Sequence, residues 1–273
     1  SVTRRAKLIE SRGAKIFANT YCWALLFAAL LPQMVVIFSS FAEQWAATLF
    51  PTAYGFTNYG RVLTEVTQPI LNSLTLAGTA TILCVVFGTL AAYASIRGRF
   101  FGKWALDMTI MLPFVLPGIV TGVAFLTTFN DGFVVLSGTA TILILAYFVR
   151  RIAYTFRSVA AAMSQMDDNL EEASTVCGAT WLRTMRKVTI PLTAPGIIAG
   201  AIIVFATLIS EMSVTIILYS AKWKTVSIAI FELVLADELM DASAIGSVVI
   251  VLTLGLVFLS SRLLGKSMAD LFR

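Results

Sequence analysis

Six long apolar runs constrain what this chain can fold into more than any other feature of its sequence. Each run is long enough to cross the ~30 Å hydrocarbon core of a bilayer as a helix, which takes ~20 residues. A backbone in lipid must satisfy its hydrogen bonds internally, and a helix does so within one segment. We therefore expect an all-α, polytopic membrane protein with six transmembrane helices, at residues 21–41, 70–96, 108–129, 132–149, 196–221 and 242–261.

Composition supports the same class. Hydrophobic residues make up 58% of the 273 residues and charged residues 13%, whereas charged residues are about 25% of a soluble domain. The basic N-terminal stretch precedes an apolar run that is too long for a secretory signal and lacks a small-residue cleavage site. The expected organisation is a cytoplasmic N-terminal segment (1–20), a transmembrane domain (21–264) and a cytoplasmic tail (265–273).

The distribution of lysine and arginine predicts the orientation. If the N-terminus is cytoplasmic, every basic residue except Arg61, Lys222 and Lys224 falls on the cytoplasmic side of the six spans. Positively charged loops stay inside, so both termini are expected to be cytoplasmic. Contact with anionic lipid then accounts for the net charge of +5 without a nucleic-acid partner.

The chain offers little material for enzymatic chemistry. It contains no histidine, which excludes Ser-His and Cys-His catalysis and histidine-ligated metal sites. Cys22, Cys84 and Cys177 are expected to be free thiols. Residues 98–104 echo a phosphate-binding loop, but they have too few residues between the glycines and no Ser or Thr after Lys103. We expect no catalytic residue, no cofactor, no metal and no nucleotide site.

The stretch from 150 to 195 is the longest expected cytoplasmic loop, and its sequence is patterned. Asp168 and Glu171 have the spacing of a helix capping box, and Gly178 is placed to end the short helix that follows. A second helix comes next, and Pro191 is expected to stop it. The loop is therefore predicted to be a helix, a glycine turn and another helix at the membrane surface.

Within this loop, EASTVCG is followed by nine residues and then VTIP. This resembles the cytoplasmic motif of the permease subunits of binding-protein-dependent ATP-binding-cassette (ABC) importers, which is Glu-Ala-Ala, three residues, Gly, nine residues, Ile, one residue, Leu-Pro. The matching residues are Glu172, Ala173, Gly178 and Pro191, and conservative replacements stand at Ser174, Val188 and Ile190.

The resemblance implies a type I ABC importer permease fold, in which these coupling helices dock in a groove of an ATPase subunit and transmit its closure to the membrane helices. Glu172 and Gly178 would make the fitted contact. The residues implied in coupling are Glu171, Glu172, Ala173, Ser174, Val176, Gly178, Ala179, Trp181, Val188, Ile190 and Pro191.

Two further stretches extend the resemblance. Residues 112–122 (LPFVLPGIVTG) and 209–233 resemble segments of permeases for ferric iron, phosphonates, sugar phosphates and related solutes. This implies a permease of the bacterial inner membrane that forms a translocation path. The implied partners are cytoplasmic ATPase subunits, an extracytoplasmic solute-binding protein, membrane lipid and a second permease unit that is identical, different or fused in the same chain.

Two prolines and a polar cluster are candidate residues of that path. Proline removes a backbone hydrogen bond from a span, and the freed groups must be buried in protein or line a wet path. Glu211 is the one charged residue within the six runs, and such a group is costly unless it is paired or solvated. Its role is open between a helix-packing bond, a substrate contact and a gate. The candidate path residues are Pro113, Pro117, Ser210, Glu211, Ser213 and Thr215.

A secondary transporter is the alternative function. It would bind its solute and a coupling ion near the midplane through ionisable residues. Only Glu211 is available for that purpose, and the patterned loop would have no role. An intramembrane enzyme would need a catalytic pair or metal cluster within the spans, for which the sequence has no material.

Overall fold

The computed structural model describes residues 11–45, 48–167 and 169–271, which form a helical bundle with one small antiparallel hairpin. The helices are α1 (Arg12–Ser40), α2 (Thr57–Glu65), α3 (Thr67–Arg97), α4 (Lys103–Val115), α5 (Gly118–Phe129), α6 (Ala140–Ser164), α7 (Asn169–Val176), α8 (Trp181–Thr184), α9 (Ile190–Ile209), α10 (Thr215–Leu218), α11 (Val226–Leu235) and α12 (Leu239–Leu271). A π-helical turn (Met185–Thr189) joins α8 to α9, a 3-10 turn (Ala221–Trp223) precedes α11, and the strands are β1 (Ala42–Gln44) and β2 (Ala53–Tyr54).

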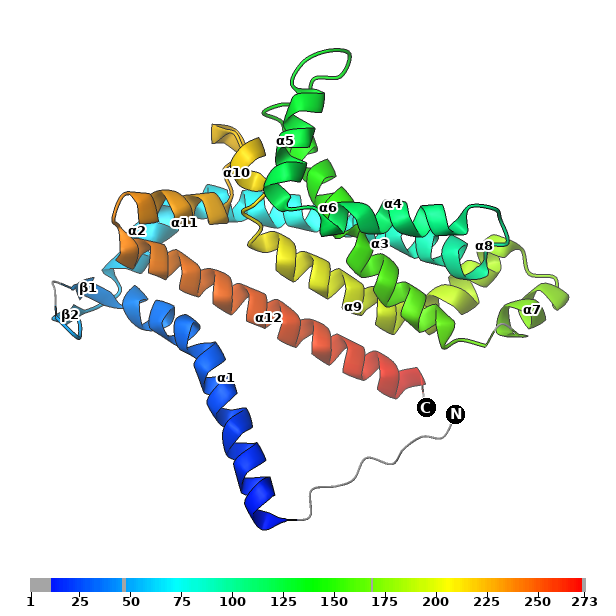
Figure 1. Cartoon of the computed structure of the whole chain (residues 1–273), viewed down its shortest axis with the longest axis horizontal. Coiled ribbons are helices and arrows are strands. Elements are labelled where there is room, and N and C mark those ends of the chain that lie inside the picture. Colours follow the sequence, from blue (N-terminus) through cyan, green and yellow to red (C-terminus); the bar gives the residue numbers. More distant parts are fainter. Residues whose placement is uncertain (1–10, 46–47, 168, 272–273) are drawn as a thin grey trace.

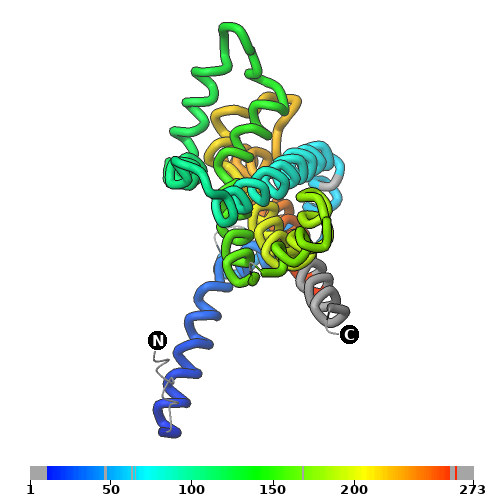
Figure 2. Tube along the Cα trace, turned by 90° about the vertical axis from the view of Figure 1, so that its right-hand side faces the viewer, coloured from blue at the N-terminus to red at the C-terminus, as the bar shows by residue number. Residues whose placement is uncertain are grey.

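Three long helices, α3, α6 and α9, form the centre of the bundle (Figures 1 and 2). Glycines let the three helices approach one another closely around Thr155. A methyl group at Gly88 of α3 would lie 3.0 Å from Cβ of Thr155 in α6, and one at Gly200 of α9 would lie 2.9 Å from Cα of the same threonine. Small residues let neighbouring membrane helices approach closely, so Thr155 is fully enclosed between the two glycines.

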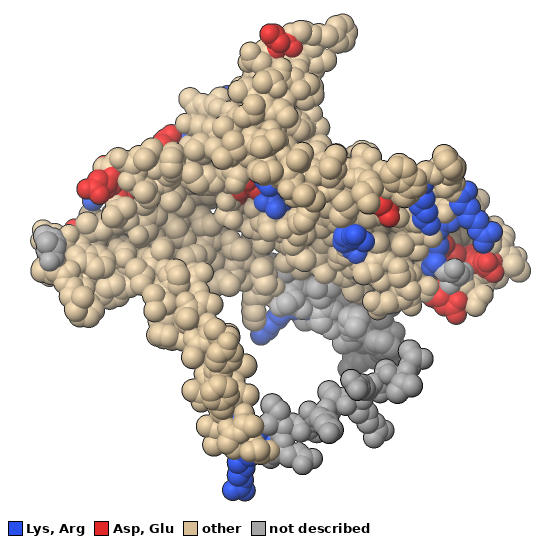
Figure 3. All heavy atoms as spheres, viewed as in Figure 1, with Lys and Arg blue, Asp and Glu red and all other residues tan. Residues whose placement is uncertain are grey.

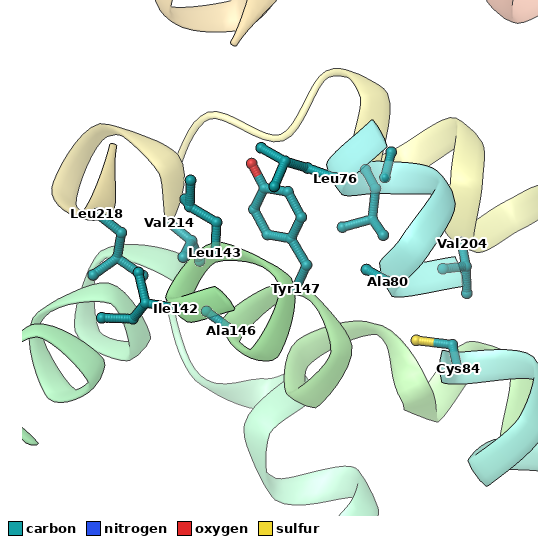
Figure 4. Close-up of a cluster of buried hydrophobic side chains, with 12 residues drawn as sticks. Leu76, Ala80, Cys84, Ile142, Leu143, Ala146, Tyr147, Val204, Val214 and Leu218 are labelled. Carbon is teal, nitrogen blue, oxygen red and sulfur yellow. The ribbon is translucent and has the colours of Figure 1, made fainter. Parts of the chain in front are cut away.

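A cluster of apolar side chains fills the space beside this contact. It is drawn in Figure 4, which shows the Tyr147 ring directed from α6 into the cluster beside Leu76 of α3. Leu143 of α6, Val204 of α9 and Val214, which follows α9, complete its centre, and all are buried. The cluster therefore holds the end of α9 against α3 and α6.

Two helices leave the bundle on opposite sides, as Figures 1 and 2 show for α1 and α5. α1 contacts α12 near its C-terminal end, where Val36 approaches Gly246. No residue in the most apolar part of α1 is buried within the chain. Its apolar side chains are therefore left for lipid or for another protein.

The two ends of the bundle carry different elements (Figure 1). One end holds the hairpin, α2 and α11, and there Arg61 of α2 pairs with Asp241 of α12 at 2.8 Å. The other end holds α7 and α8. Figure 3 shows charged atoms at these two ends, at the lower tip of α1 and near the top of α5, with a wide surface between them that a few charged groups interrupt. This is the charge distribution of a membrane-spanning bundle.

The predicted spans differ from the structure in several places. Within the described residues, four helices are long and apolar enough to span a membrane, at Arg12–Ser40, Thr67–Arg97, Trp181–Ile209 and Leu239–Phe258. A fifth candidate is the pair α4 and α5, which meet at an angle of 106°. The predicted count of six spans is thus not reached by length and apolarity alone.

The predicted fourth and fifth runs need correction. Residues 132–139 are not helical, and α6 continues past Val149 to Ser164 with three arginines in it. Likewise the predicted run from Gly196 to Ala221 is interrupted, because α9 ends at Ile209. In both cases the helix is displaced from the apolar run, since packing rather than hydropathy decides where it begins and ends.

The terminal helices extend into the predicted flanking segments. α1 already begins at Arg12, within the predicted N-terminal segment 1–20, and α12 runs through Leu271, within the predicted tail 265–273. Both helices therefore continue past their apolar runs.

Candidate functional site

The glycine turn between α7 and α8 has the geometry that the sequence predicts. Gly178 has φ of +80°, a backbone conformation that side chains disfavour. Its N–H donates to the carbonyl of Thr175 at 2.9 Å, and the N–H of Ala179 donates to the carbonyl of Ser174 at 3.1 Å. These two bonds make the Schellman motif that ends a helix. Gly178 thus closes α7 and starts the turn into α8.

Glu171 makes two contacts that the sequence did not predict, and the predicted capping box is not tested. Its partner in that box, Asp168, lies outside the described residues. The Glu171 carboxylate accepts a hydrogen bond from the Thr189 hydroxyl at 2.7 Å, and it lies 3.5 Å from Nε of Arg97 in α3. Both charged side chains are largely buried. Glu171 therefore joins α7 to the ends of two long helices.

A second polar contact closes the segment, which we call the coupling segment (residues 169–191). The Ser174 and Thr184 hydroxyls lie 2.9 Å apart and link α7 to α8. Trp181 packs its ring edge-on against Tyr93 of α3, with the ring centres 6.0 Å apart. Two contacts thus fix the coupling segment to α3, from Glu171 to Arg97 and from Trp181 to Tyr93. Two more, Glu171 with Thr189 and Ser174 with Thr184, hold the segment together internally.

Much of the coupling segment remains exposed. Val176 is 87% exposed and Trp181 is 54% exposed. Glu172, Ala173 and Gly178 are also exposed. Within the described residues, the Glu172 carboxylate makes no hydrogen bond or ion pair, and no atom lies within 4 Å of a methyl group placed on Gly178. Of the other predicted residues, Ser174, Ala179, Val188 and Pro191 are half-buried and Ile190 is exposed.

Pro191 does not stop the helix, contrary to the prediction. The helical path is continuous from Trp181 to Ile209. Proline lacks an N–H and would break an α-helical turn, but here a π-helical turn precedes it, in which the Ile190 N–H reaches back to the carbonyl of Met185. The wider turn accommodates the proline at the start of α9. The coupling segment is therefore continuous with a long helix of the bundle.

A second polar site lies at the far end of α9. Nη1 of Arg150 lies 3.2 Å from Oε1 of Glu211, and Nη2 of Arg151 pairs with Oε2 of the same carboxylate. The side chain of Glu211 is 4% exposed, and those of the arginines are 13% and 15% exposed. We call these three residues the charged cluster.

The charged cluster lies at the level of the centre of α3. The Cys84 thiol, near the middle of α3, lies 3.7 Å from the carbonyl oxygen of Phe148 in α6, and Gly88 meets Thr155. Arg150 and Arg151 fall between these two levels. α3 is a candidate span with no charged residue before Arg97. The prediction that Arg150 and Arg151 lie in a cytoplasmic loop is therefore wrong, because their charges are met inside the bundle.

Backbone and hydroxyl groups hold the Glu211 turn in place. Oε1 accepts hydrogen bonds from the N–H groups of Ser213 at 3.1 Å and Val214 at 3.4 Å. The buried Thr215 hydroxyl donates to the Glu211 carbonyl at 2.7 Å and lies 2.6 Å from the Tyr147 hydroxyl. The predicted helix-packing role of Glu211 thus has a direct structural basis.

The remaining candidate path residues are placed unevenly. Ser210 and Ser213 are exposed and line an open cavity of about 330 Å³ with the charged cluster, whereas Thr215 is fully buried. Pro117 directly precedes α5 at the 106° bend, and Pro113 lies inside α4. Pro113 is not among the residues that line this cavity.

Sequence reasoning missed Arg150, Arg151 and Tyr147. The two arginines directly follow an apolar run, and such a position normally marks the end of a span. The signal that points to them is charge balance: Glu211 is the one carboxylate within the apolar runs, and a buried carboxylate needs a cationic partner.

Comparison with known protein families decides the class of the chain. Residues 84–270 match the model of the family described as "Binding-protein-dependent transport system inner membrane component". The chain belongs to this family. It is therefore a permease component of a binding-protein-dependent transport system of the inner membrane, and the predicted resemblance is confirmed.

Two relatives of this permease carry names for different solutes. It is 28% identical over 234 residues to a ferric transport system permease protein of Actinobacillus pleuropneumoniae, covering 85% of this chain and 34% of the relative. It is 29% identical over 239 residues to a protein of Salmonella typhimurium named for a 2-aminoethylphosphonate transport system permease, covering 85% and 88%. The chain thus spans about a third of the first relative and most of the second.

Solved structures confirm the fold. A bacterial ABC transporter for the import of the acidic polysaccharide alginate has a chain that aligns with a TM-score of 0.68 at 18% identity, covering 92% of this permease and 99% of that chain. The MetNI methionine ABC transporter has a chain with a TM-score of 0.63 at 16% identity, covering 76% and 98%. The permease therefore has the fold of type I ABC importer permeases.

Proposed function

We propose that this permease forms half of the translocation path of an ATP-driven importer, and that its coupling segment docks on a separate ATPase subunit. The observation that carries the proposal is the exposed side of α7 and α8, with an unpaired acidic residue, Glu172, an apolar residue, Val176, and open space at Gly178. An exposed surface of this kind on an otherwise anchored element is available for a partner to bind. The family is one of binding-protein-dependent transport.

The connections of the coupling segment give it a mechanical role. Closure of the ATPase subunits would displace α7, and the Glu171 carboxylate would pass the displacement to α3 through Arg97 and to α9 through Thr189. Because the helix from Trp181 to Ile209 is continuous, the same displacement reaches the turn that holds Glu211. Rigid coupling of this kind can switch a site between inward and outward access.

The same proposal fixes the orientation and partners. The end with α7 and α8 faces the cytoplasm together with both termini, as the excess of basic residues on that side favours. An extracytoplasmic solute-binding protein would dock at the opposite end, which holds the hairpin, α2 and α11. A second permease unit would cover apolar surface of α1 or α5, which leave the bundle on opposite sides. Ferric iron, a phosphonate or a related solute is the proposed cargo, in line with the relatives' names.

Co-purification with the candidate ATPase tests the proposal. The wild-type permease should retain the ATPase, whereas Glu172→Lys and Gly178→Asp should lose it while still inserting in the membrane. Gly132→Asp is the matched control, because Gly132 also has a positive φ, of +91°, with no atom within 4 Å of an added methyl group. Glu238→Lys, at an exposed position outside the coupling segment, controls for charge reversal.

ATP dependence in proteoliposomes separates this function from its alternative. Solute uptake that requires ATP and the ATPase subunit supports the importer. Uptake that is driven by an ion gradient without ATP, or equal retention of the ATPase by wild type and variants, would reject it in favour of a secondary transporter.

A further inference from the structure

The charged cluster contains more positive than negative charge. Two guanidinium groups face one carboxylate, since both Arg150 and Arg151 pair with Glu211. All three side chains are largely buried at the level of the centre of α3. A buried charge without a counter-charge is strongly unfavourable. The arrangement therefore suits a site that binds an anion.

The cluster also has more hydrogen-bond donors than acceptors. Each guanidinium has five N–H donors, and each arginine is paired with Glu211 through a single nitrogen. The Nε atoms of both arginines are buried without a partner in the described part of the chain. Glu211, by contrast, also accepts backbone N–H groups of Ser213 and Val214. The carboxylate has four hydrogen-bonding partners, whereas each guanidinium uses one nitrogen.

The N-terminus of α5 adds positive potential at the same place. Gly118 is its first residue, and a methyl group there would lie 2.8 Å from Nη1 of Arg150 and 2.5 Å from Cβ of Ser213. The first N–H groups of a helix lack partners within it and carry partial positive charge, which favours an anion. Glycine at this position lets the helix end approach the cluster.

A cavity borders the charged cluster. It has a volume of about 330 Å³ and is open on one side. Hydroxyl groups of Thr207, Ser210 and Ser213 line it together with the charged cluster and Met212. Arginine and hydroxyl donors are the groups that bind phosphate-like and carboxylate anions.

We propose that this cavity is a binding site for the transported solute and that the solute carries an oxyanion group, such as a phosphonate, phosphate, sulfate or carboxylate. Glu211 offsets part of the arginine charge while the site is empty and holds the guanidinium groups in place. A bare ferric ion would be repelled by the excess positive charge, so iron would pass only as an anionic complex. This inference rests on the proposed transport function and names its substrate class.

Direct anion binding to the full chain tests the inference without the ATPase. The permease is placed in phosphatidylcholine nanodiscs, and saturable binding of inorganic phosphate, methylphosphonate and sulfate is measured at millimolar concentration. Arg151→Gln should weaken binding by about 10- to 100-fold, the value of one charged hydrogen-bonding partner. Glu211→Gln should tighten it, because it removes the competing carboxylate. Arg157→Gln, which removes an exposed arginine of the same helix outside the cavity, should change nothing.

A second pair of variants tests the inference if loss of an arginine prevents folding. Ser210 is exposed, lines the cavity and makes no side-chain hydrogen bond within the described residues. Ser210→Glu should abolish anion binding by adding a negative charge, whereas Ser210→Gln, of the same size, should retain it. The inference is overturned if wild type binds none of the three anions. It is also overturned if Glu211→Gln and Arg151→Gln weaken binding alike while Ser210→Glu has no effect. That result would mean that the charged cluster only stabilises the fold.

The experiments distinguish failure of the proposed ATPase coupling from failure of the proposed anion site. Gly178→Asp should bind anions like wild type and lose the ATPase. Normal anion binding, combined with ATPase retention that is unchanged in Gly178→Asp, would reject the proposed coupling alone. ATPase retention that responds to Gly178→Asp, combined with no anion binding by wild type, would reject the anion site alone.

Discussion

Thr189 donates a hydrogen bond to the Glu171 carboxylate across 2.7 Å, and this contact joins α7 to the π-helical turn that leads into α9. The same carboxylate lies 3.5 Å from Arg97 at the end of α3. One side chain thus connects a short exposed helix to two buried ones. A change at Glu171 should therefore affect coupling more than it affects docking.

Glu171→Gln should lower solute-stimulated ATP hydrolysis several-fold while the ATPase still co-purifies. The amide keeps the size of the side chain and can still accept from Thr189, but it loses the ion pair with Arg97, and charge-assisted bonds are roughly twice as strong as neutral ones. The measurement is ATPase activity of the full complex with and without solute-binding protein. Glu172→Gln is the neighbouring control for charge loss, and an equal fall in ATPase retention for both variants would argue against separate roles.

Gly178→Ala should weaken the C-terminal end of α7 by about 1–2 kcal/mol, because alanine in the left-handed region meets its own backbone. No other atom lies within 4 Å of the added methyl group, so the cost is confined to the backbone. Gly178→Asn should cost less, since asparagine tolerates this conformation. Hydrogen exchange of the α7 amides measures the difference, and identical exchange in wild type and the alanine variant would contradict it.

Gly196→Ala should destabilise the bundle by about 1–3 kcal/mol, as overpacking does in other cores. The added methyl group would lie 2.6 Å from Cβ of Ala162 and 2.8 Å from the backbone oxygen of Ser158. Neither atom belongs to a flexible side chain that could move away. Gly78→Ala on α3 is the matched control, because nothing lies within 4 Å of its methyl group. Thermal unfolding in detergent should show a lower Tm for the first variant only.

Tyr147→Phe should cost about 1 kcal/mol of stability, the net value of a typical hydrogen bond. The lost bond is the buried contact of 2.6 Å between the Tyr147 and Thr215 hydroxyls. A double-mutant cycle with Thr215→Val isolates the pair, since Thr215 also donates to the Glu211 carbonyl. Additive effects in that cycle would mean that the two hydroxyls do not interact.

Cys177 should react with a membrane-impermeant maleimide from the cytoplasmic side of the membrane only. It is exposed in the coupling segment, whereas Cys84 is buried in α3 and should not react from either side until the protein is denatured. A Cys22→Ser background removes the third thiol. Labelling of Cys177 from the outer side of intact spheroplasts would reverse the proposed orientation.

The sequence predicts the glycine turn and the class of fold well, because both depend on local chemistry. Gly178 ends α7 because of its own backbone preference, and long apolar runs can be stable in lipid only as helices. The charged cluster could not be read in the same way, since it joins residues 60 positions apart in the chain. Two arginines after an apolar run look like the end of a span until the position of Glu211 is known. The continuation of the helix through Pro191 likewise depends on a π-helical turn, which the conformational preferences of the local residues do not predict.

The separation of Arg151 from Glu211 along the chain also bears on how the protein is made. Ribosomes deliver α6 to the membrane before the residues of α9 exist, so its arginines arrive without their carboxylate. Each arginine at the centre of a helix costs about 2.5–3.5 kcal/mol on membrane-insertion scales. We therefore expect α6 to reach its final position only after synthesis has passed Glu211, so that the second half of the nascent chain would influence the final topology of the first.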